Sequence, residues 1–170
     1  MINKPVLFIN VGVPGSGKST FCRNHMYEFP IVSRDTIRFS LLNDTDDYFS
    51  KEDKVYDIFI KTIANNLKAN KSCVADATHL NEKARKKLVN ALIKENCSID
   101  SYQICFLYFD IPLETCQHRN AKRIGREFVP EDVVRSMYKS LTAPTEDEFP
   151  NVFHIFTIKE GDLTYDFSKL

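Results

Sequence analysis

The sequence predicts an α/β protein in which a central parallel sheet lies between two layers of helices. Apolar runs of strand length alternate along the chain with segments that carry apolar residues at helical spacing. This alternation is typical of parallel sheets joined by crossover helices. The run PVLFINV is rich in branched and aromatic residues, as expected for a strand covered on both faces. A length of 170 residues predicts one domain over residues 1–170, because domains cluster at about 100–150 residues.

The first half of the chain contains three of the expected strands. Strands are expected at residues 5–11, 31–33 and 72–76. Helices are expected at residues 19–28, 34–42 and 50–67, the last of them after a polar, acidic loop at 43–49. Ser50 with Asp53 is a weak capping box for that helix, since Asp stands where Glu or Gln is preferred. Its apolar face is spaced by three and four residues and comprises Val55, Ile58, Phe59, Thr62, Ile63 and Leu67.

The second half continues the same alternation. A helix at 81–96 should turn Ala84, Leu88, Ala91 and Leu92 inward and its Lys and Arg residues outward. A strand at 101–109 should end at Asp110, and Pro112 suits the first turn of the next helix. A further helix should begin at Pro130, with a stripe formed by Val133, Val134, Met137, Tyr138 and Leu141. The last strand is expected at 152–158.

Composition excludes several classes of protein. The chain has 23 basic and 23 acidic residues with 43% hydrophobic residues, which argues against disorder of the whole chain. The neutral balance also argues against coating a nucleic acid or an anionic membrane with the entire surface. The neutral balance is compatible with a protein that binds only one end of a nucleic acid. No apolar run reaches the roughly 18 residues of a membrane-spanning helix, so no membrane partner is expected.

The cysteines and the N-terminus predict a cytoplasmic protein. The five cysteines are widely spaced, without a CxxC pair, so free thiols in a reducing cytosol are expected rather than disulfides or a zinc site. The first residues, MINKPVLFINVG, are too short and too strand-like for a signal peptide.

Three of the five glycines lie within six residues, in a motif that binds phosphate. The segment GVPGSGKS at 12–19 fits G-x-x-x-x-G-K-[ST] between an expected strand and an expected helix. Backbone N–H groups can wrap a polyphosphate only where glycine permits close approach and positive φ, and the helix N-terminus adds its dipole. Lys18 would bridge the β- and γ-phosphates, and the Ser19 hydroxyl would ligate Mg²⁺. The motif therefore predicts binding of a nucleoside triphosphate in a P-loop NTPase sandwich.

The P-loop alone does not define the reaction. The base-reading motif NKxD of GTPases is not found in the sequence, and a motor ATPase would usually be longer. A small phosphoryl-transfer enzyme would need an acceptor-activating carboxylate, a clamp for the acceptor and a lid that carries cations.

Asp35 and Arg38 are the candidates for carboxylate and clamp. They are spaced i, i+3 at a helix start that follows the strand at 31–33, so they share one face at the ligand edge of a parallel sheet. The carboxylate could take the proton of an attacking hydroxyl, and the arginine could hold an anionic part of the acceptor. The alternative is an N-capping Asp with an intrahelical Asp–Arg pair.

Asp76 and Thr78 close the third strand and open onto the same crevice. Thr78 could donate to the acceptor, and Asp76 could support Mg²⁺ from behind its ligands, because it ends an apolar strand as a Walker-B carboxylate does. Capping of a loop is an equal alternative for both. His79 is expected to be a surface histidine, and Asp110 is expected to form a turn or cap before Pro112.

A basic segment provides the candidate lid. Residues 119–126 contain four basic side chains, no acidic one and Gly125, and Pro130 follows. A charge run is usually a solvated helix face. After the fourth strand and its helix, however, small P-loop kinases close a lid over the triphosphate. Arginines closing there would stabilise the transferring phosphoryl group and exclude water. We therefore expect a helical lid at about 119–129.

Four segments together resemble a known family. GVPGSGKST, SRDTIR, DATHLN and RNAKR…VPEDVVRSMYKSL closely resemble the kinase domain of bacteriophage polynucleotide 5′-hydroxyl kinase, over about residues 5–142. The resemblance implies transfer of the γ-phosphate of ATP to the 5′-OH end of DNA or RNA with Mg²⁺, in the host cytoplasm if the protein is phage-encoded. It implies Lys18 and Ser19 on ATP and Mg²⁺, Asp35 as general base, and Arg38 on the phosphate 3′ of the acceptor nucleoside.

The resemblance also extends to the rest of the expected site. It implies Thr78 near the acceptor and Arg123 as the lid arginine, with Arg119 assisting. His79 departs from the usual Asn, and a lid one residue longer before Val129 makes Arg126 an alternative to Arg123. The chain contains no DxDxT motif, so no phosphatase activity is expected.

The sequence thus predicts an ATP- and Mg²⁺-dependent polynucleotide 5′-hydroxyl kinase. The expected catalytic residues are Lys18, Asp35, Arg38 and Arg123. The expected ATP-binding residues are Gly12, Gly15, Ser16, Gly17, Lys18, Ser19, Thr20, Arg119, Arg123 and Arg126. The expected acceptor-binding residues are Arg34, Asp35, Arg38, Asp76 and Thr78. The alternatives are a kinase of a small hydroxyl metabolite or nucleoside, and a non-catalytic ATP-binding regulatory module. Mere binding has no need of Asp35, which argues against the last.

The zero net charge conceals a positive region. Residues 1–40 carry five basic and two acidic groups, and residues 119–126 add four basic ones. The compensating acidic residues fall at 43–57 and 144–170, so a positive crevice suited to ATP and one nucleic-acid end is expected.

Overall fold

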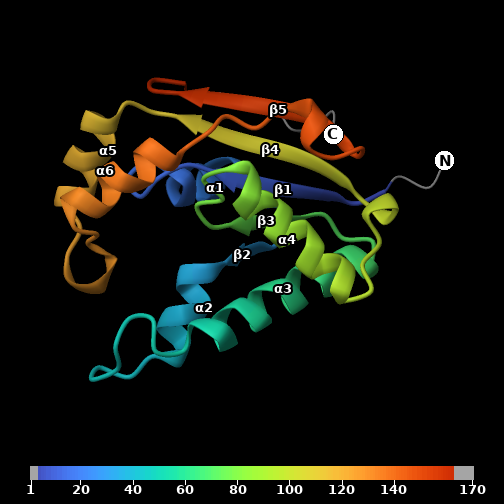
Figure 1. Cartoon of the computed structure of the whole chain (residues 1–170), viewed down its shortest axis with the longest axis horizontal. Coiled ribbons are helices and arrows are strands. Elements are labelled where there is room, and N and C mark those ends of the chain that lie inside the picture. The colour runs from blue at the N-terminus through green and yellow to red at the C-terminus, as the bar shows by residue number, and fades with distance from the viewer. Residues whose placement is uncertain (1–3, 163–170) are drawn as a thin grey trace.

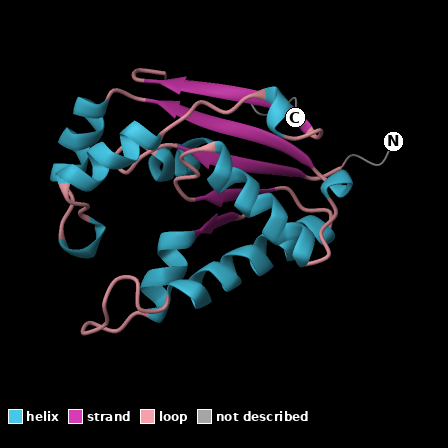
Figure 2. Ribbon diagram, viewed as in Figure 1, coloured by secondary structure: helices cyan, strands magenta, loops and turns pink. Residues whose placement is uncertain are grey.

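The central element of the fold is a parallel sheet of five strands. The computed structural model describes residues 4–162, and the strands lie in the order β2-β3-β1-β4-β5. Their bounds are β1 Val6–Val11, β2 Ile31–Ser33, β3 Cys73–Asp76, β4 Gln103–Asp110 and β5 Val152–Lys159. Every pair of neighbouring strands is parallel, and all arrowheads point to one edge of the sheet (Figure 2). The predicted parallel sheet and its strand positions are confirmed.

Six α-helices and three short 3₁₀ helices connect the strands in the described part of the chain. The α-helices are α1 Lys18–His25, α2 Arg34–Leu41, α3 Glu52–Lys68, α4 Glu82–Lys94, α5 Leu113–Ala121 and α6 Glu131–Ser140. The 3₁₀ helices are Ile99–Ser101, Gly125–Glu127 and Glu146–Glu148. Figure 1 shows α3 and α4 side by side and the ends of α5 and α6 close together. No helix among residues 4–162 has the length and apolar character required to cross a bilayer.

Two apolar cores lie on opposite faces of the sheet, which makes the three layers. Alternate residues of β1 point to opposite faces, as the pleat of a strand requires. Leu7 and Ile9 pack with the apolar faces of α3 and α4. Phe8 packs with the buried side chains of α1, α5 and α6. All six residues of β1 are buried, so the strand that leads into the P-loop is rigidly held from both sides.

Several local predictions were wrong, for physical reasons that the structure makes clear. Helix α1 ends at His25, before residue 28, because Met26 and Phe29 form a turn that redirects the chain toward β2. The residue at the N-cap of α3 is Lys51 and not Ser50. The Ser50 hydroxyl instead donates to the carbonyl of Asp47, at 2.7 Å, a local bond that competes with capping.

Arg85 also differs from expectation, because it points into the protein. It was expected on the solvated face of α4, yet its side chain is fully buried and pairs with Glu148. Its guanidinium donates further to the carbonyls of His79 and Thr142, both at 3.1 Å. A buried charge is tolerated only when it is paired and hydrogen-bonded in this way. The pair fastens α4 to the loop after β3 and to the segment after α6.

The predicted apolar stripe of α6 is confirmed in part, and the predicted free thiols are confirmed. Val134 of α6 is fully buried, whereas Val133 of the same predicted stripe is 38% exposed. All five cysteines are buried and free of disulfide bonds. Burial raises the pKa of the Cys22 thiol to about 12, so these cysteines are apolar core residues rather than reactive thiols.

Candidate active site

The P-loop lies where the sequence places it, between β1 and α1. Gly15 and Gly17 adopt positive φ values of 81° and 94°, and a side chain on Gly15 would collide with the backbone of Cys116 in α5. Gly12 leaves no room either, because an added Cβ would lie 2.7 Å from the Ser16 hydroxyl. Close packing therefore requires glycine at positions 12 and 15, and the positive φ favours glycine at position 17.

Lys18 is folded across the P-loop. Its ammonium group donates to the carbonyl of Val13 at 2.8 Å and to the hydroxyl of Ser16 at 3.4 Å. Burial lowers the pKa of Lys18 to about 8, against the attraction of the Asp76 charge and with help from the charge of Arg123. A cation desolvated in this way gains stability when an anion enters the loop.

Ser19 faces a carboxylate at the end of β3. Its hydroxyl donates to Asp76 Oδ2 at 3.4 Å, while Asn10 of β1 donates to Asp76 Oδ1 at 2.8 Å. Asp76 is only 7% exposed. A hydroxyl beside a fixed carboxylate is the hard oxygen set that Mg²⁺ binds together with phosphates and water, so the residues present fit the ion. Among residues 4–162, no group of three or more His, Cys, Asp or Glu side chains forms a metal cluster.

The remaining P-loop residues lie around the same turn. Ser16 is buried, and its N–H donates to the carbonyl of Val13 at 3.2 Å. Thr20 is exposed on the first turn of α1, where its hydroxyl accepts from Arg23 at 3.3 Å.

Asp35 and Arg38 meet in the first turns of α2, as their spacing predicted. Arg38 is 4% exposed and pairs with Asp35, whose side chain is 65% exposed. Ser33 caps this helix by accepting from the N–H of Thr36 at 3.3 Å, so Asp35 is free of the capping role that was its alternative. The Asp35 charge acts on Lys18, which places the carboxylate within electrostatic range of the P-loop cation.

Two residues that sequence reasoning missed complete this network. Glu52, at the start of α3, accepts from Arg38 Nη2 at 2.7 Å and also pairs with Arg34. Tyr48 donates to Asp35 Oδ1 at 3.0 Å, and the Arg38 guanidinium lies 4.6 Å from the centroid of its ring.

Arg34 and Arg38 are the features of the sequence from which these two partners could have been predicted. When two arginines share one helix face and their guanidinium groups are partly buried, they require a carboxylate partner. The predicted polar loop at 43–49 and the start of the following helix were the nearest source of one.

The charges of this network reinforce one another. Burial alone would lower the pKa of Arg38, but its hydrogen bond with Glu52 holds the pKa above the ordinary value. Burial would likewise raise the pKa of Glu52, yet the bonds from Arg38 and Arg34 hold it below its usual range. Burial and the charge of Asp35 raise the pKa of Tyr48 to about 12. The phenol therefore remains a hydrogen-bond donor to Asp35 at neutral pH.

The loop after β3 supports the P-loop from behind. The carbonyl of Thr78 accepts from the N–H of Gly12 at 3.0 Å. His79 is 8% exposed, so the expectation of a surface histidine was wrong. Its Nδ1 lies 2.9 Å from the carbonyl of Asn10, and burial lowers its pKa to about 4. His79 also adopts a positive φ of 41°, which a packed, hydrogen-bonded loop can hold.

The basic segment divides into parts with different neighbours. Arg119, on α5, approaches the P-loop, with Nη1 3.5 Å from the carbonyl of Ser16. Arg123 donates to the carbonyl of Glu127 at 3.4 Å, and its charge acts on Lys18. Both arginines therefore lie near the P-loop.

Arg126 lies elsewhere. Its Nη2 donates to the carbonyls of Asn43, Asp44 and Asp46, at 2.9, 2.7 and 3.0 Å. These residues belong to the acidic loop between α2 and α3. Figure 1 shows this loop and the segment after α5 on the same side of the molecule. Arg126 therefore bridges the segment that carries Arg123 to the loop that carries Tyr48.

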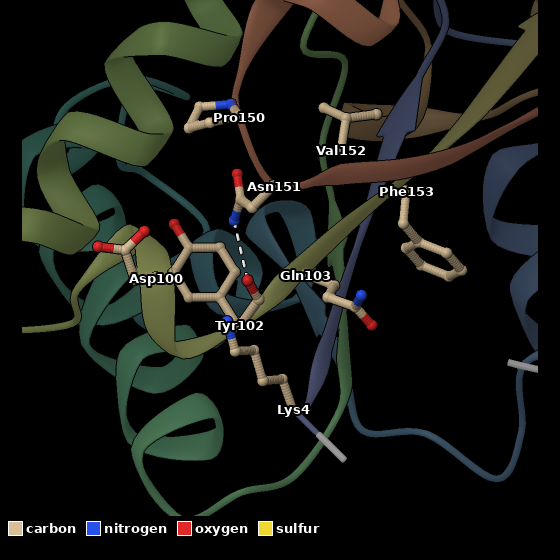
Figure 3. A pocket seen from close by; sticks show the side chains of 8 residues that line it. All are labelled: Lys4, Asp100, Tyr102, Gln103, Pro150, Asn151, Val152 and Phe153. Atoms are coloured by element: carbon tan, nitrogen blue, oxygen red, sulfur yellow. Dashed lines mark hydrogen bonds between the residues drawn. The ribbon is translucent and has the colours of Figure 1, made fainter. Parts of the chain in front are cut away.

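A small hollow lies away from these residues. It has a volume of about 250 Å³ and is lined by residues of the amino ends of β4 and β5, among them Gln103 and Val152 (Figure 3). In it, Asn151 donates to the carbonyl of Tyr102 at 3.0 Å. The amino ends of parallel strands are opposite the ligand edge, and none of the predicted site residues lines this hollow.

The fold and the site define a class of protein, and comparison with known proteins supports the same class. The structure is a three-layer α/β sandwich of the P-loop kinase fold. Residues 7–144 match the family described as AAA domain, and the chain belongs to this family.

Three solved structures illustrate the likeness. A chain of the Pnkp1/Rnl/Hen1 RNA repair complex is 27% identical, with a TM-score of 0.70 over 82% of this chain and 44% of its own. This chain therefore spans less than half of that protein's length. A putative kinase from Chloroflexus aurantiacus J-10-fl is 14% identical, with a TM-score of 0.65 over 94% and 87%. A gluconokinase from Sinorhizobium meliloti 1021 is 17% identical, with a TM-score of 0.55 over 95% and 86%. The last two show a shared fold only.

Proposed function

We propose that the chain is an ATP- and Mg²⁺-dependent kinase of the 5′-hydroxyl ends of polynucleotides. The observation that carries the proposal is the exposed carboxylate of Asp35, held beside the buried Arg38 within electrostatic range of Lys18. A site that merely binds a nucleotide needs no such carboxylate. The 27% identity to a chain of an RNA repair complex favours a nucleic-acid end as the acceptor.

On the donor side, the P-loop and its surroundings would bind the phosphates of ATP. The N–H groups around Gly15 and Gly17 would wrap the phosphates, and Lys18 would exchange the Val13 carbonyl for phosphate oxygens. Ser19 would hold Mg²⁺, with Asp76 behind it. When bound, the ion neutralises charge on the phosphates. Arg119 and Arg123 would approach the same phosphates from the lid and stabilise the charge that develops during transfer.

On the acceptor side, Asp35 would take the proton of the attacking hydroxyl. Tyr48 and Arg38 both donate to Asp35 Oδ1, while Oδ2 has no hydrogen-bond partner among residues 4–162. One carboxylate oxygen is thus fixed by two donors and the other is available to the substrate. These donors orient the carboxylate before the acceptor arrives, which is the geometry that general-base catalysis requires.

Arg38 and Arg34 would recognise the phosphate that follows the reacting nucleoside. Glu52 holds both guanidinium groups, so neither has to be ordered when the acceptor binds. An acceptor phosphate would share the Arg38 guanidinium with Asp35 and so hold the reacting hydroxyl beside that carboxylate. Arg126 would keep the lid and the acceptor loop together while both substrates are present.

The substitution Asp35→Asn tests this proposal. It should leave ATP binding unchanged and lower transfer to a 5′-OH oligonucleotide by about 10²- to 10⁴-fold, the usual contribution of a general base. The matched control is Asp53→Asn, which removes an exposed carboxylate from the first turn of α3 and should retain full activity. Calorimetric titration with ATP and end-labelling from γ-labelled ATP measure the two effects. Full activity of Asp35→Asn would refute the assignment of the base.

The main alternative is a kinase of the same fold that acts on a small hydroxyl metabolite or nucleoside. The shared fold of a gluconokinase is equally compatible with both readings, because fold does not determine the acceptor. Consumption of ATP with sugars or free nucleosides, without labelling of oligonucleotides, would favour the alternative.

A further inference from the structure

A basic groove lies between α3 and α4, outside the catalytic residues described above. Its volume is about 830 Å³. Its charged and aromatic lining consists of Tyr56 from α3 and Glu82, Lys83, Lys86, Lys87 and Lys94 from α4. Helices α3 and α4 lie side by side and cover the same face of the sheet (Figure 1). The groove is a shallow, open depression along α4, with Tyr56 as its lining residue from α3, so a ligand of extended shape can lie along it.

The charge of the groove is positive and mostly uncompensated. Four lysines line it against one acidic residue, and that residue, Glu82, pairs with Lys86 one helical turn away. Lys83, Lys87 and Lys94 are exposed and form no ion pair among residues 4–162. A lysine face on a helix is often only a solvated surface. Here the lysines border one groove, so an anionic ligand in that groove could contact several of them.

The groove is continuous with the acceptor side of the site. The ring of Tyr56 contacts two cations: Arg34 at 5.3 Å and Lys87 at 4.9 Å from its centroid. Arg34 shares Glu52 with Arg38. Contacts therefore run from Arg38 through Glu52 and Arg34 to Tyr56 and the start of the groove. Helix α4 also begins directly after the loop that follows β3, at the ligand edge of the sheet.

The length of the groove matches several nucleotides. Lys83 and Lys94 are 11 positions apart on one helix, or about 16 Å along its axis at 1.5 Å per residue. The phosphates of one strand in a duplex are spaced by about 3.4 Å along the axis. The lysines thus cover roughly five phosphates at that spacing. The positive charge and the length both suit the backbone of a nucleic acid strand.

We propose that this groove binds the sugar-phosphate backbone of the acceptor strand beyond its reacting 5′ end. The proposal rests on the proposed function and extends it, since it assigns the body of the strand to a face of the molecule that takes no part in catalysis. The strand would leave the reacting hydroxyl at Asp35, pass Arg38 and Arg34, and continue along α4. Binding through Lys83, Lys87 and Lys94 would be electrostatic and independent of sequence.

The test replaces three lysines together and compares acceptors of two lengths. The variant Lys83→Gln/Lys87→Gln/Lys94→Gln should raise KM for a single strand of about twelve nucleotides by about ten- to a hundredfold. It should leave KM for a nucleoside 3′-monophosphate and KM for ATP unchanged. The slope of log K for the longer strand against log salt should become shallower by about 2, because three phosphate contacts at about 0.7 each are lost.

The matched control removes the same charge from the far half of α3 and from the turn that follows it. The variant Lys61→Gln/Lys68→Gln/Lys71→Gln changes exposed lysines outside the groove and should behave as the wild type. Thermal unfolding of both variants checks that the fold is retained. Equal KM values of the wild type and the groove variant for the longer strand would overturn the groove proposal.

Failure of the proposed function gives a different result. In that case the wild type does not label the twelve-nucleotide strand, whether or not it labels the nucleoside 3′-monophosphate. Fluorescence anisotropy with the same twelve-nucleotide strand then tests the groove by itself. Weaker binding by the groove variant than by the control variant supports the groove, and equal binding by both overturns it.

Discussion

The proposed donor and acceptor sides of the site are built in different ways. The donor side comes from one contiguous segment, whose backbone conformation at Gly15 and Gly17 and whose Lys18 create the binding site. The acceptor side comes from side chains of several segments, with Glu52 joining Arg34 and Arg38. A site made by a short motif is visible in the sequence. A site made by side chains that meet only in the folded chain is visible in part.

The two sides also differ in charge balance. Within residues 4–162 the Lys18 ammonium group donates hydrogen bonds only to a carbonyl and a hydroxyl, and burial lowers its pKa to about 8. Arg38 is only 4% exposed and is paired with Glu52 and Asp35. The donor side thus has its positive charge available for the phosphates of ATP. The acceptor side is already neutralised, so it would contribute orientation more than attraction.

The largest effect is expected from the donor side. Replacement of Lys18 by Met removes the cation that would bridge the β- and γ-phosphates. Transfer should fall by about 10³-fold or more, the scale on which single cations act in phosphoryl transfer. Steady-state kinetics with ATP and a 5′-OH oligonucleotide measure the loss. A loss of less than about tenfold would show that the P-loop cation has no part in the reaction.

A smaller effect, confined to the acceptor, is expected from Glu52→Gln. This change leaves Arg34 and Arg38 without their shared carboxylate and should raise the acceptor KM by about ten- to a hundredfold, because the clamp loses its orientation. The KM for ATP should stay the same. Asp53→Asn, on the same turn of α3, is the control. A rise in the KM for ATP as large as that for the acceptor would remove the distinction between the two sides.

The pH dependence of ATP binding provides a third comparison. Lys18 attracts phosphate only in its protonated form, and its pKa in the nucleotide-free protein is lowered to about 8 by burial. The affinity for ATP should therefore be constant below this pH and fall by up to about tenfold per pH unit above it. Calorimetric titrations between pH 7 and pH 9.5 measure this trend. Lys18→Met should bind weakly and without the dependence, and an unchanged wild-type affinity at pH 9.5 would contradict the account.

The smallest effect is expected where the two sides meet. Arg126→Ala removes three hydrogen bonds between the lid and the loop at 43–46. Each substrate should still bind alone, but the gain in acceptor affinity that ATP provides should shrink by about fivefold. Arg135→Ala, which breaks an exposed pair on α6, is the control. Acceptor titrations with and without a non-hydrolysable ATP analogue measure the coupling, and an unaltered gain would assign Arg126 a purely structural role.

The sequence predicted the features that depend on local pattern. The strands, their parallel pairing and the placement of the P-loop follow from short apolar runs and one contiguous motif. The pairing of Asp35 with Arg38 follows from their helical spacing. These features need no knowledge of what lies opposite them in the fold.

The features that the sequence did not predict depend on tertiary contacts. His79 and Arg85 are polar residues in polar stretches, yet both are buried. Arg85 bonds to the segment after α6, and His79 lies against the ring of Phe59 and the carbonyl of Asn10. Glu52 and Arg126 find partners far along the chain, at Arg38 and at the carbonyls of 43–46. No local pattern records such pairs, since their spacing is set by the packing of α2, α3 and the lid.

The acceptor specificity of the unmodified protein tests the central claim most directly. The protein is incubated with γ-labelled ATP and Mg²⁺ and with a panel of 5′-OH RNA, 5′-OH DNA, 5′-phosphorylated strands, nucleosides and sugars. The account predicts label at the 5′ ends of the hydroxyl-terminated strands, none on the phosphorylated strands and a higher kcat/KM for strands than for nucleosides or sugars. Labelling of sugars or nucleosides but not of any strand would contradict it.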